Sequence, residues 1–342
     1  MRSSLRTILI VAAAAVLIVL FLRNVDLRQV GADIAHANLA WLALTFTTFV
    51  VVIGIRARRW QFLLAPLGQA SFANSFRATA IGFAASSVLP ARAGEVIRPY
   101  FLARQEHLSA TGAFATIVIE RVLDVVTVLV LLASFVFVFG RQQAAEHPDT
   151  FTPIRWAGVA AAAGAAAALA LLFVLAGRPS ALDRTIETIE RALPQRLSGF
   201  LARLVARFTE GLAVVRQPER LFVALLWSFP LWLTIAVGIW SVAKAFGLLV
   251  PFTGAFLMIA LLVIGGAVPT PGGIGGFHEA FRVGATTFFG AGNEAAVGAA
   301  IVLHAFSIIP VLALGGVFAA QAGLNFGSMR HMADEAGAER PA

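Results

Sequence analysis

Long apolar runs, separated by short polar segments, make up most of this chain. A helix needs about 20 residues to cross the hydrocarbon core of a bilayer. Six runs reach or approach that length, at about residues 6–23, 39–56, 112–139, 155–177, 220–245 and 294–322. The alternation that marks membrane strands is absent from them. The pattern predicts an all-α polytopic membrane protein with about six full spans, in a single transmembrane domain over residues 1–325.

Two further apolar regions, about 72–106 and 252–290, are interrupted by helix-breaking residues. Backbone that leaves the helix at membrane depth is tolerated where it lines a polar cavity or is buried in protein. We interpret both regions as re-entrant helical hairpins, and the second also fits two short full spans. The residues expected to shape the two hairpins are Pro90, Gly94, Pro271, Gly272, Gly273 and Gly275.

The arginines outside the apolar runs orient the chain. Cytoplasmic loops of membrane proteins are enriched in arginine, and here arginines precede the first run, follow the second and recur through 178–220. Both termini are then cytoplasmic, with 24–38 and 140–154 outside. Each half, about 1–150 and 151–325, reads as span, span, hairpin, span. Because three spans is an odd number, the second half is inverted, and a binding site is expected where the hairpin tips meet.

Two segments lie outside this plan. Apolar residues recur every three or four positions through 178–220, with arginines on the other faces. This predicts one or two amphipathic helices, which either lie on the inner membrane surface or pack beneath the bundle. Residues 326–342 are small and polar and are predicted to form a disordered C-terminal tail.

Composition narrows the class of function. The 342 residues are 59% hydrophobic and 13% charged, with a mean hydropathy of +0.85 and no cysteine. These values exclude a soluble domain, disulfides and thiolate metal sites. Lys244 is the only lysine among 26 basic residues. Guanidinium groups suit lipid phosphates, although an arginine-biased genome is the simpler explanation. Because no ATP-hydrolysing or metal motif is present, we expect no cofactor, no metal and no nucleic-acid partner.

The first broken region carries charges directly after its proline. Arg92, Glu95 and Arg98 follow Pro90, where a helix begins. A positive helix end with two guanidinium groups predicts an anion site, and a lipid phosphate is the natural anion in a membrane. The alternative is that these side chains snorkel to water at the interface. The Glu-x-x-Arg step recurs in the second region, which adds Glu279 and Arg282 to the predicted substrate-binding residues.

The third predicted span contains Glu120, Arg121 and Asp124. Glu120 and Asp124 share a helix face, and Arg121 and Asp124 are spaced to pair. Ionisable groups inside a span require partners or water. They either line a functional cavity or form a structural ion cluster. In the functional reading Arg121 binds substrate, and Glu120, Asp124 and Glu279 are candidates for proton coupling, because burial raises the pKa of a carboxyl group.

Two other positions receive structural interpretations. Arg56, Arg58, Arg59 and Trp60 follow the second span and are interpreted as a positively charged and aromatic interface anchor. His304 lies in the last span and is interpreted as a hydrogen-bonded helix contact, with a role as proton carrier as the alternative.

Four motifs occur in an order that resembles one family. They are Arg-x-Arg-Arg-Trp at 56–60, Leu-Pro-Ala-Arg-Ala-Gly-Glu-Val-Ile-Arg at 89–98, Glu-Arg-Val-Leu-Asp at 120–124 and Pro-Thr-Pro-Gly-Gly-Ile-Gly at 269–275. The set resembles the lysylphosphatidylglycerol synthase transmembrane, or flippase-like, family over about residues 5–325. The resemblance implies an integral protein of the cytoplasmic membrane linked to translocation of lipids or lipid-linked sugars. Some relatives accompany envelope-lipid synthesis, so such enzymes are expected partners.

We therefore expect a lipid flippase-like transporter that moves an anionic lipid or lipid-linked intermediate between leaflets, and not an enzyme. Without an ATP motif its cycle must be ion-coupled or downhill. Two alternatives stay open: a membrane-embedded lipid-modifying enzyme with Glu120 or Asp124 as base, and a non-catalytic scaffold. Relatives that make aminoacylated lipids carry a soluble domain after the membrane part. The sequence stops at residue 342, so aminoacyl transfer is not expected.

The orientation is testable because single cysteines can be placed freely in a chain without any. A cysteine at Ser198 should resist an impermeant thiol reagent in cells with a permeabilised outer membrane, because 178–220 is predicted to face the cytoplasm. A cysteine at Gln143 should react under the same conditions. Labelling at Ser198 with protection at Gln143 would reverse the orientation.

Overall fold

The computed structural model describes residues 25–89, 93–139, 217–267 and 270–324, and some positions between 16 and 23 and between 152 and 167. Within these ranges the chain is helical, without strands. The predicted spans at 6–23 and 155–177 lie largely outside the described residues. The amphipathic segment at 178–220, apart from its last residues, and the C-terminal tail also lie outside them.

Four described helices are long and apolar enough to cross a membrane. They are α3 (Leu39–Leu64), α6 (Ala110–Ser134, continued by the π-helical turn η2, Phe135–Phe139), α11 (Pro218–Ala245) and α14 (Asn293–Gln321). Their starts follow from local chemistry. The Asn38 side chain accepts hydrogen bonds from the backbone N–H groups of Ala40 and Trp41, and Ser109 accepts one from Gly112. Four predicted spans are thus confirmed as helices.

Each broken region forms a pair of packed helices. The first pair is α4 (Phe72–Val88) and α5 (Gly94–Glu106), and the second is α12 (Gly254–Gly266) and α13 (Gly276–Phe289). The second break contains the short 3₁₀ turn η4 (Pro271–Gly273). Gly272, Gly273 and Gly275 have φ of 61°, 73° and 89°, a backbone region that favours glycine. The prediction of two helix–break–helix units is confirmed, and their re-entrant insertion stays a prediction.

Glycine allows the two helices of each pair to approach closely. A Cβ atom on Gly94 of α5 would lie 1.8 Å from the Gly82 carbonyl oxygen of α4. A Cβ atom on Gly265 of α12 would lie 2.3 Å from the Gly276 carbonyl oxygen of α13. Small residues bring membrane helices into backbone contact in this way. The two pairs therefore share a packing device as well as a break.

The open end of the first pair is closed by Glu106, the last residue of α5. Its carboxylate accepts hydrogen bonds from the backbone and hydroxyl of Ser71, both 2.8 Å long, and from the amide of Asn74 at 2.9 Å. Partial burial raises the pKa of Glu106, but these hydrogen bonds outweigh it and lower the pKa below its ordinary value. The contact joins the end of α5 to the start of α4.

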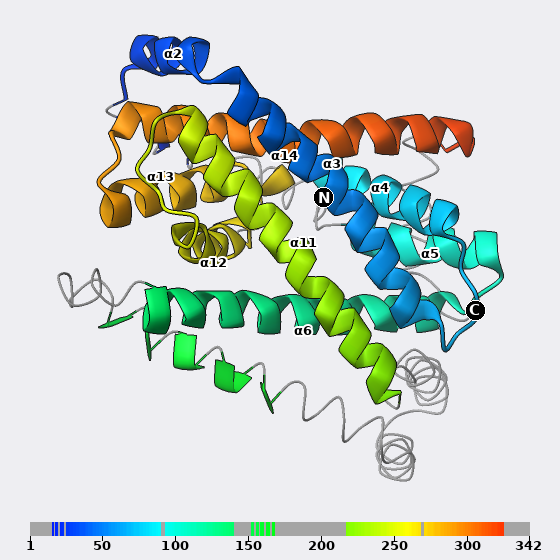
Figure 1. The fold of residues 1–342 in the computed structure, drawn as a ribbon. Helices are drawn as coiled ribbons and strands as arrows, with labels where there is room; N and C mark the ends of the chain where they lie inside the picture. Colours follow the sequence, from blue (N-terminus) through cyan, green and yellow to red (C-terminus); the bar gives the residue numbers. More distant parts are fainter. Residues whose placement is uncertain are drawn as a thin grey trace, which may run out of the picture.

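The two pairs meet at their breaks. Figure 1 shows α4 and α5 on one side of the bundle and α12 and α13 on the other, with α6 running past both pairs. Helix α3 packs along α11, α4 packs along α14, and η4 contacts α4. The short helix α2 (Leu27–His36) packs on α14. This arrangement places the tips of both pairs beside the same stretch of α6, and the site is built there.

The glycine contact of the first pair can be tested by adding one methyl group. Gly94→Ala should lower the free energy of unfolding by about 1–3 kcal/mol, because the methyl group overlaps the Gly82 carbonyl. Gly54→Ala in α3, where nothing lies within 4 Å, should be neutral or stabilising by about 0.5–1 kcal/mol. Thermal melting in detergent measures both. Equal melting temperatures for the two variants would contradict the close contact.

Candidate functional site

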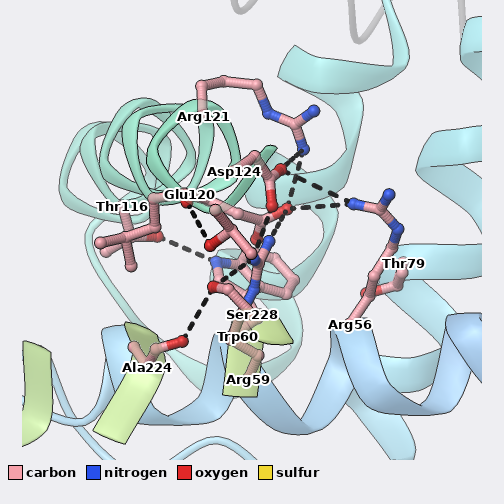
Figure 2. Close-up of polar contacts among 12 residues, drawn as sticks. Arg56, Arg59, Trp60, Thr79, Thr116, Glu120, Arg121, Asp124, Ala224 and Ser228 are labelled. Carbon is pink, nitrogen blue, oxygen red and sulfur yellow. Dashed lines mark hydrogen bonds and ion pairs between the residues drawn. The ribbon is translucent and has the colours of Figure 1, made fainter. Parts of the chain in front are cut away.

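A cluster of charged side chains lies inside the bundle, where α3, α5 and α6 meet (Figure 2). Its two acids, Glu120 and Asp124 of α6, are 0% and 5% exposed. Its four bases are Arg56 and Arg59 of α3, Arg98 of α5 and Arg121 of α6. We call these six residues the ion cluster.

Asp124 joins three helices. Its Oδ1 accepts a hydrogen bond of 2.6 Å from Nη1 of Arg59 on α3 and one of 3.0 Å from Nε1 of Trp232 on α11. The same Arg59 nitrogen donates to the Ser228 hydroxyl on α11 at 2.8 Å. Because a buried charge is destabilising unless it is paired and hydrogen-bonded, this contact holds α3, α6 and α11 in one register.

Glu120 connects α6 to the first helix pair through Arg98 of α5. Its carboxylate accepts hydrogen bonds from Nη1 of Arg98 at 3.0 Å and from Nη2 of Arg121 at 2.9 Å, and it lies 3.3 Å from Nη2 of Arg59. The Arg98 guanidinium lies 3.9 Å from the centre of the Trp60 ring, a favourable cation–π distance. Trp60 is itself held by a hydrogen bond of 2.9 Å from its Nε1 to the Thr116 hydroxyl.

Positive charge exceeds negative charge in the ion cluster. Four guanidinium groups face two carboxylates, which leaves an excess of two charges. Several guanidinium nitrogens are buried without a hydrogen-bond acceptor within the described residues, including Nε and Nη2 of Arg98 and Nε of Arg121. Buried donors are normally satisfied. The arrangement is therefore suited to an additional anion.

A cavity of about 260 Å³ opens beside the ion cluster, between the two helix pairs. One wall comes from α4, α5 and α6, and the other from the second break. The first residues of α5 and α13 also reach it, so two helix N-termini, which carry partial positive charge, meet there. The lining includes Gly82, Ser86, Ser87, Gly94, Glu95, Arg98, Arg121, Thr270, Gly272, Gly273 and Phe277.

The structure brings together part of the predicted substrate-binding set. Glu95, Arg98 and Arg121 line the cavity, as do Gly94, Gly272 and Gly273, whereas Arg92 and Pro90 lie outside the described residues. Glu279 and Arg282 do not line it. Arg282 donates to the Glu279 carboxylate, with an Nε–Oε2 distance of 2.8 Å, and to the amide oxygen of Asn293 at 3.1 Å. This pair lies apart from the ion cluster.

The interpretation of 56–60 as an interface anchor is wrong for two of its residues. Arg59 and Trp60 are 0% exposed and belong to the interior, and only Arg58 is classed as exposed. The physical reason is that α3 continues to Leu64, well beyond the predicted end of the span at 56. The signal that points to this outcome is the unbalanced acids of 120–124, which require basic partners from another helix.

A second, apolar cavity of about 180 Å³ lies between α11, α12 and α14. Its lining includes Phe49, Trp232, Ile235, Ile259, Leu262 and Leu303. Phe277 lines both cavities. The indole of Trp232 also reaches the ion cluster through its hydrogen bond to Asp124. A charged and an apolar cavity therefore lie next to each other.

The ion pair between Arg59 and Asp124 should dominate stability. Arg59→Met leaves a buried carboxylate without its main partner and should lower the free energy of unfolding by about 3–5 kcal/mol. Arg58→Met, one residue away and exposed, should change it by less than about 0.5 kcal/mol. Melting in detergent compares the two. If Arg59→Met and Asp124→Asn are simply additive in the double variant, the pair contributes no coupling energy.

Comparison with known proteins agrees with this architecture. The model of the lysylphosphatidylglycerol synthase transmembrane region matches residues 7–315. Glycosyltransferase AglD of Haloferax volcanii is 25% identical over 315 residues, which cover 86% of this chain and 50% of that protein. The UPF0104 membrane protein MJ1595 of Methanocaldococcus jannaschii is 31% identical over 103 residues, which cover 29% of this chain and 31% of that protein. The matched segments thus cover 50% of the length of AglD and 31% of the length of MJ1595. By the match over 7–315, this chain belongs to the lysylphosphatidylglycerol synthase transmembrane family.

Proposed function

We propose that this membrane protein binds an anionic lipid, or a lipid-linked intermediate, by its phosphate and moves it between the leaflets of the cytoplasmic membrane. One observation carries the proposal: a cavity between two broken helix pairs is lined by Arg98 and Arg121, which have guanidinium donors to spare. Paired breaks of this kind commonly mark the substrate site of a transporter.

The charges of the cavity favour a phosphate diester or monoester. Arg98 is held in place by Glu120 and by the Trp60 ring, so its free nitrogens are preorganised. The Arg121 side chain is 39% exposed, and it can reorient toward a ligand. A planar guanidinium binds two phosphate oxygens at once, which an ammonium group does not. Glu95 also lines the cavity, and its carboxylate disfavours a headgroup of high negative charge.

The apolar cavity supplies a place for hydrocarbon. It is lined by aromatic and aliphatic side chains, and Phe277 connects it to the charged cavity. A lipid placed across this junction has its phosphate at Arg98 and Arg121 and the start of one chain against Trp232 and Leu303. Burial of hydrocarbon and pairing of the headgroup then act on the same molecule. This arrangement favours an amphipathic substrate over a free inorganic anion.

The carboxylates of the ion cluster have a clear positioning role in this proposal. Glu120 and Asp124 are counter-ions that fix Arg59 and Arg98 at defined places beside the cavity. A proton on either acid would have to displace a guanidinium partner. Proton coupling through Glu120, Asp124 or Glu279, like the binding roles of Arg92, Glu279 and Arg282, stays a prediction from the sequence.

The name of one relative supports a second candidate function. The alignment with glycosyltransferase AglD covers 86% of this chain at 25% identity. This likeness favours a role beside, or in, the processing of envelope glycolipids. In that case the same cavity would hold a lipid-linked sugar, and Glu95 would be the carboxylate next to its headgroup. Turnover of the lipid without a change of leaflet would favour this enzyme over the transporter.

Replacement of one cavity arginine tests the proposed function. Arg121→Gln should slow the transfer of fluorescent phosphatidylglycerol between leaflets of proteoliposomes about tenfold or more, because a charged hydrogen bond contributes roughly 1.5–3 kcal/mol. Dithionite quenching of the outer leaflet measures the transfer. Arg121→Lys should recover only part of it, since the two-pronged contact is lost.

Two matched variants control for charge and folding. Arg58→Gln removes an exposed charge of α3 and should leave transfer unchanged. Arg282→Gln removes a charge paired outside the cavity and should have a smaller effect than Arg121→Gln. Equal loss in all three, at equal protein levels, would refute the assignment of the headgroup to this cavity. If the fluorescent lipid is chemically altered but not transferred, the enzyme hypothesis replaces the transporter hypothesis.

A further inference from the structure

A pair of histidines lies directly behind the second break. His278 is in the first turn of α13 and His304 is in the middle of α14, and their ring centres are 4.4 Å apart. Two aromatic rings flank them, with Phe277 4.9 Å from His304 and Phe21 5.2 Å from His278. The sequence predicts a hydrogen-bonded helix contact for His304. The structure confirms that contact and adds a second histidine to it.

The hydrogen bonds of the pair fix the tautomer of each ring. His304 Nε2 lies 2.9 Å from the Gly272 carbonyl oxygen, and because a carbonyl only accepts, Nε2 carries the hydrogen. Gly275 N–H donates to His278 Nδ1 at 3.2 Å, so this nitrogen is unprotonated. Among the described residues, the other ring nitrogens, His304 Nδ1 and His278 Nε2, make no hydrogen bond.

These tautomers make the two rings unequal as proton acceptors. A proton added to His304 goes to Nδ1 and leaves the bond to Gly272 intact. A proton added to His278 goes to Nδ1, where it replaces an acceptor by a donor and breaks the bond from Gly275. Two charged rings at 4.4 Å repel each other. The pair therefore accepts at most one proton, and His304 is the ring that can accept it without losing a hydrogen bond.

The bond of His304 attaches to the wall of the charged cavity. Gly272, Gly273 and Phe277 line that cavity, and the Gly272 carbonyl is the group that His304 holds. Across the cavity lie Glu95, Arg98 and Arg121. A charge on His304 adds to the positive field at the cavity, and a bound phosphate in turn stabilises that charge. Such coupling is reciprocal: each ligand raises the affinity for the other.

No carboxylate competes for this proton within the described part of the chain, because none forms an ion pair with either ring. Helix α12 carries no titratable side chain. The histidines' own helices carry Glu279 and Arg282 on α13 and Glu294 on α14. The charged or titratable groups on the elements that pack against these two helices are Arg28, Asp33 and His36 on α2 with Asp26 at its N-cap, Arg56, Arg58 and Arg59 on α3, Arg77 on α4, and Glu219, Arg220 and Lys244 on α11. Arg23 lies in the turn after Phe21.

We propose that His278 and His304 form a single-proton site that couples protonation to anion binding in the adjacent cavity. The proposal rests on the proposed function for its ligand, an anionic lipid headgroup. His304 carries the proton, and neutral His278 is a positioning residue that holds the start of α13 through Gly275. Lower pH then strengthens binding of the headgroup, and a proton gradient can drive its release on the less acidic side.

Binding of dihexanoyl phosphatidylglycerol to the full chain in neutral nanodiscs tests the proposal, because its phosphodiester does not titrate in this range. The affinity should be about fivefold or more higher near pH 5.5 than near pH 8. His304→Gln keeps an N–H donor for Gly272 but does not titrate, so it should retain the binding near pH 8 and lose the pH dependence. His107→Asn, at an exposed histidine with a positive φ that asparagine tolerates, should behave as wild type.

The outcomes separate this inference from the proposed function. If Arg121→Gln weakens binding while His304→Gln keeps the full pH dependence, the headgroup site stands and the proton site is refuted. If Arg121→Gln has no effect, the headgroup site is refuted. The proton site is then tested by NMR in the absence of lipid ligand. NMR of labelled histidine in this six-histidine chain should show His304 gaining a proton while His278 keeps its Nε2–H tautomer. A proton on His278, or two independent titrations, would overturn the proposal.

Discussion

The need to satisfy two carboxylates buried in an apolar helix governs this structure. Glu120 and Asp124 occupy α6 at positions that a membrane helix normally fills with hydrocarbon. Arg59 of α3 forms ion pairs with both acids, and Arg98 of α5 forms one with Glu120. Because these partners come from separate helices, the ion cluster sets how α3, α5 and α6 lie against one another. A shift of any one helix would leave a buried charge unpaired.

The same constraint shapes the charged cavity. Four arginines surround the two acids, and two of these arginines, Arg98 and Arg121, line the cavity where the helix pairs meet. Trp60 and Trp232 link this charge to apolar packing: one lies under the Arg98 guanidinium, and the other donates to Asp124 while it lines the apolar cavity. The contacts that stabilise the bundle thus also fix the arginines of the cavity.

The two helix pairs are alike in construction and different in chemistry. Both have a break and a glycine contact between their helices. The first pair brings arginine to the cavity, whereas the second brings glycine backbone, of which the Gly272 carbonyl is hydrogen-bonded to His304. One side of the cavity therefore carries guanidinium groups, and the other lies in front of two titratable rings. In the proposed transport cycle, the arginines would hold the headgroup and the histidine pair would control its release.

The helical class, the four described spans and the positions of both breaks follow from the amino-acid sequence alone, because apolar length and helix-breaking residues act locally. The need of the acids at 120–124 for partners is equally visible in the sequence. The tertiary structure decided which charges meet. Glu279 and Arg282 repeat the spacing of Glu95 and Arg98, yet they pair with each other outside the cavity. Arg59 and Trp60 look like an interface anchor in sequence, yet both are fully buried: Arg59 pairs with the acids, and Trp60 packs against Arg98. Spacing along one helix shows which side chains share a face, but the partner of that face comes from a distant segment, and only packing places it.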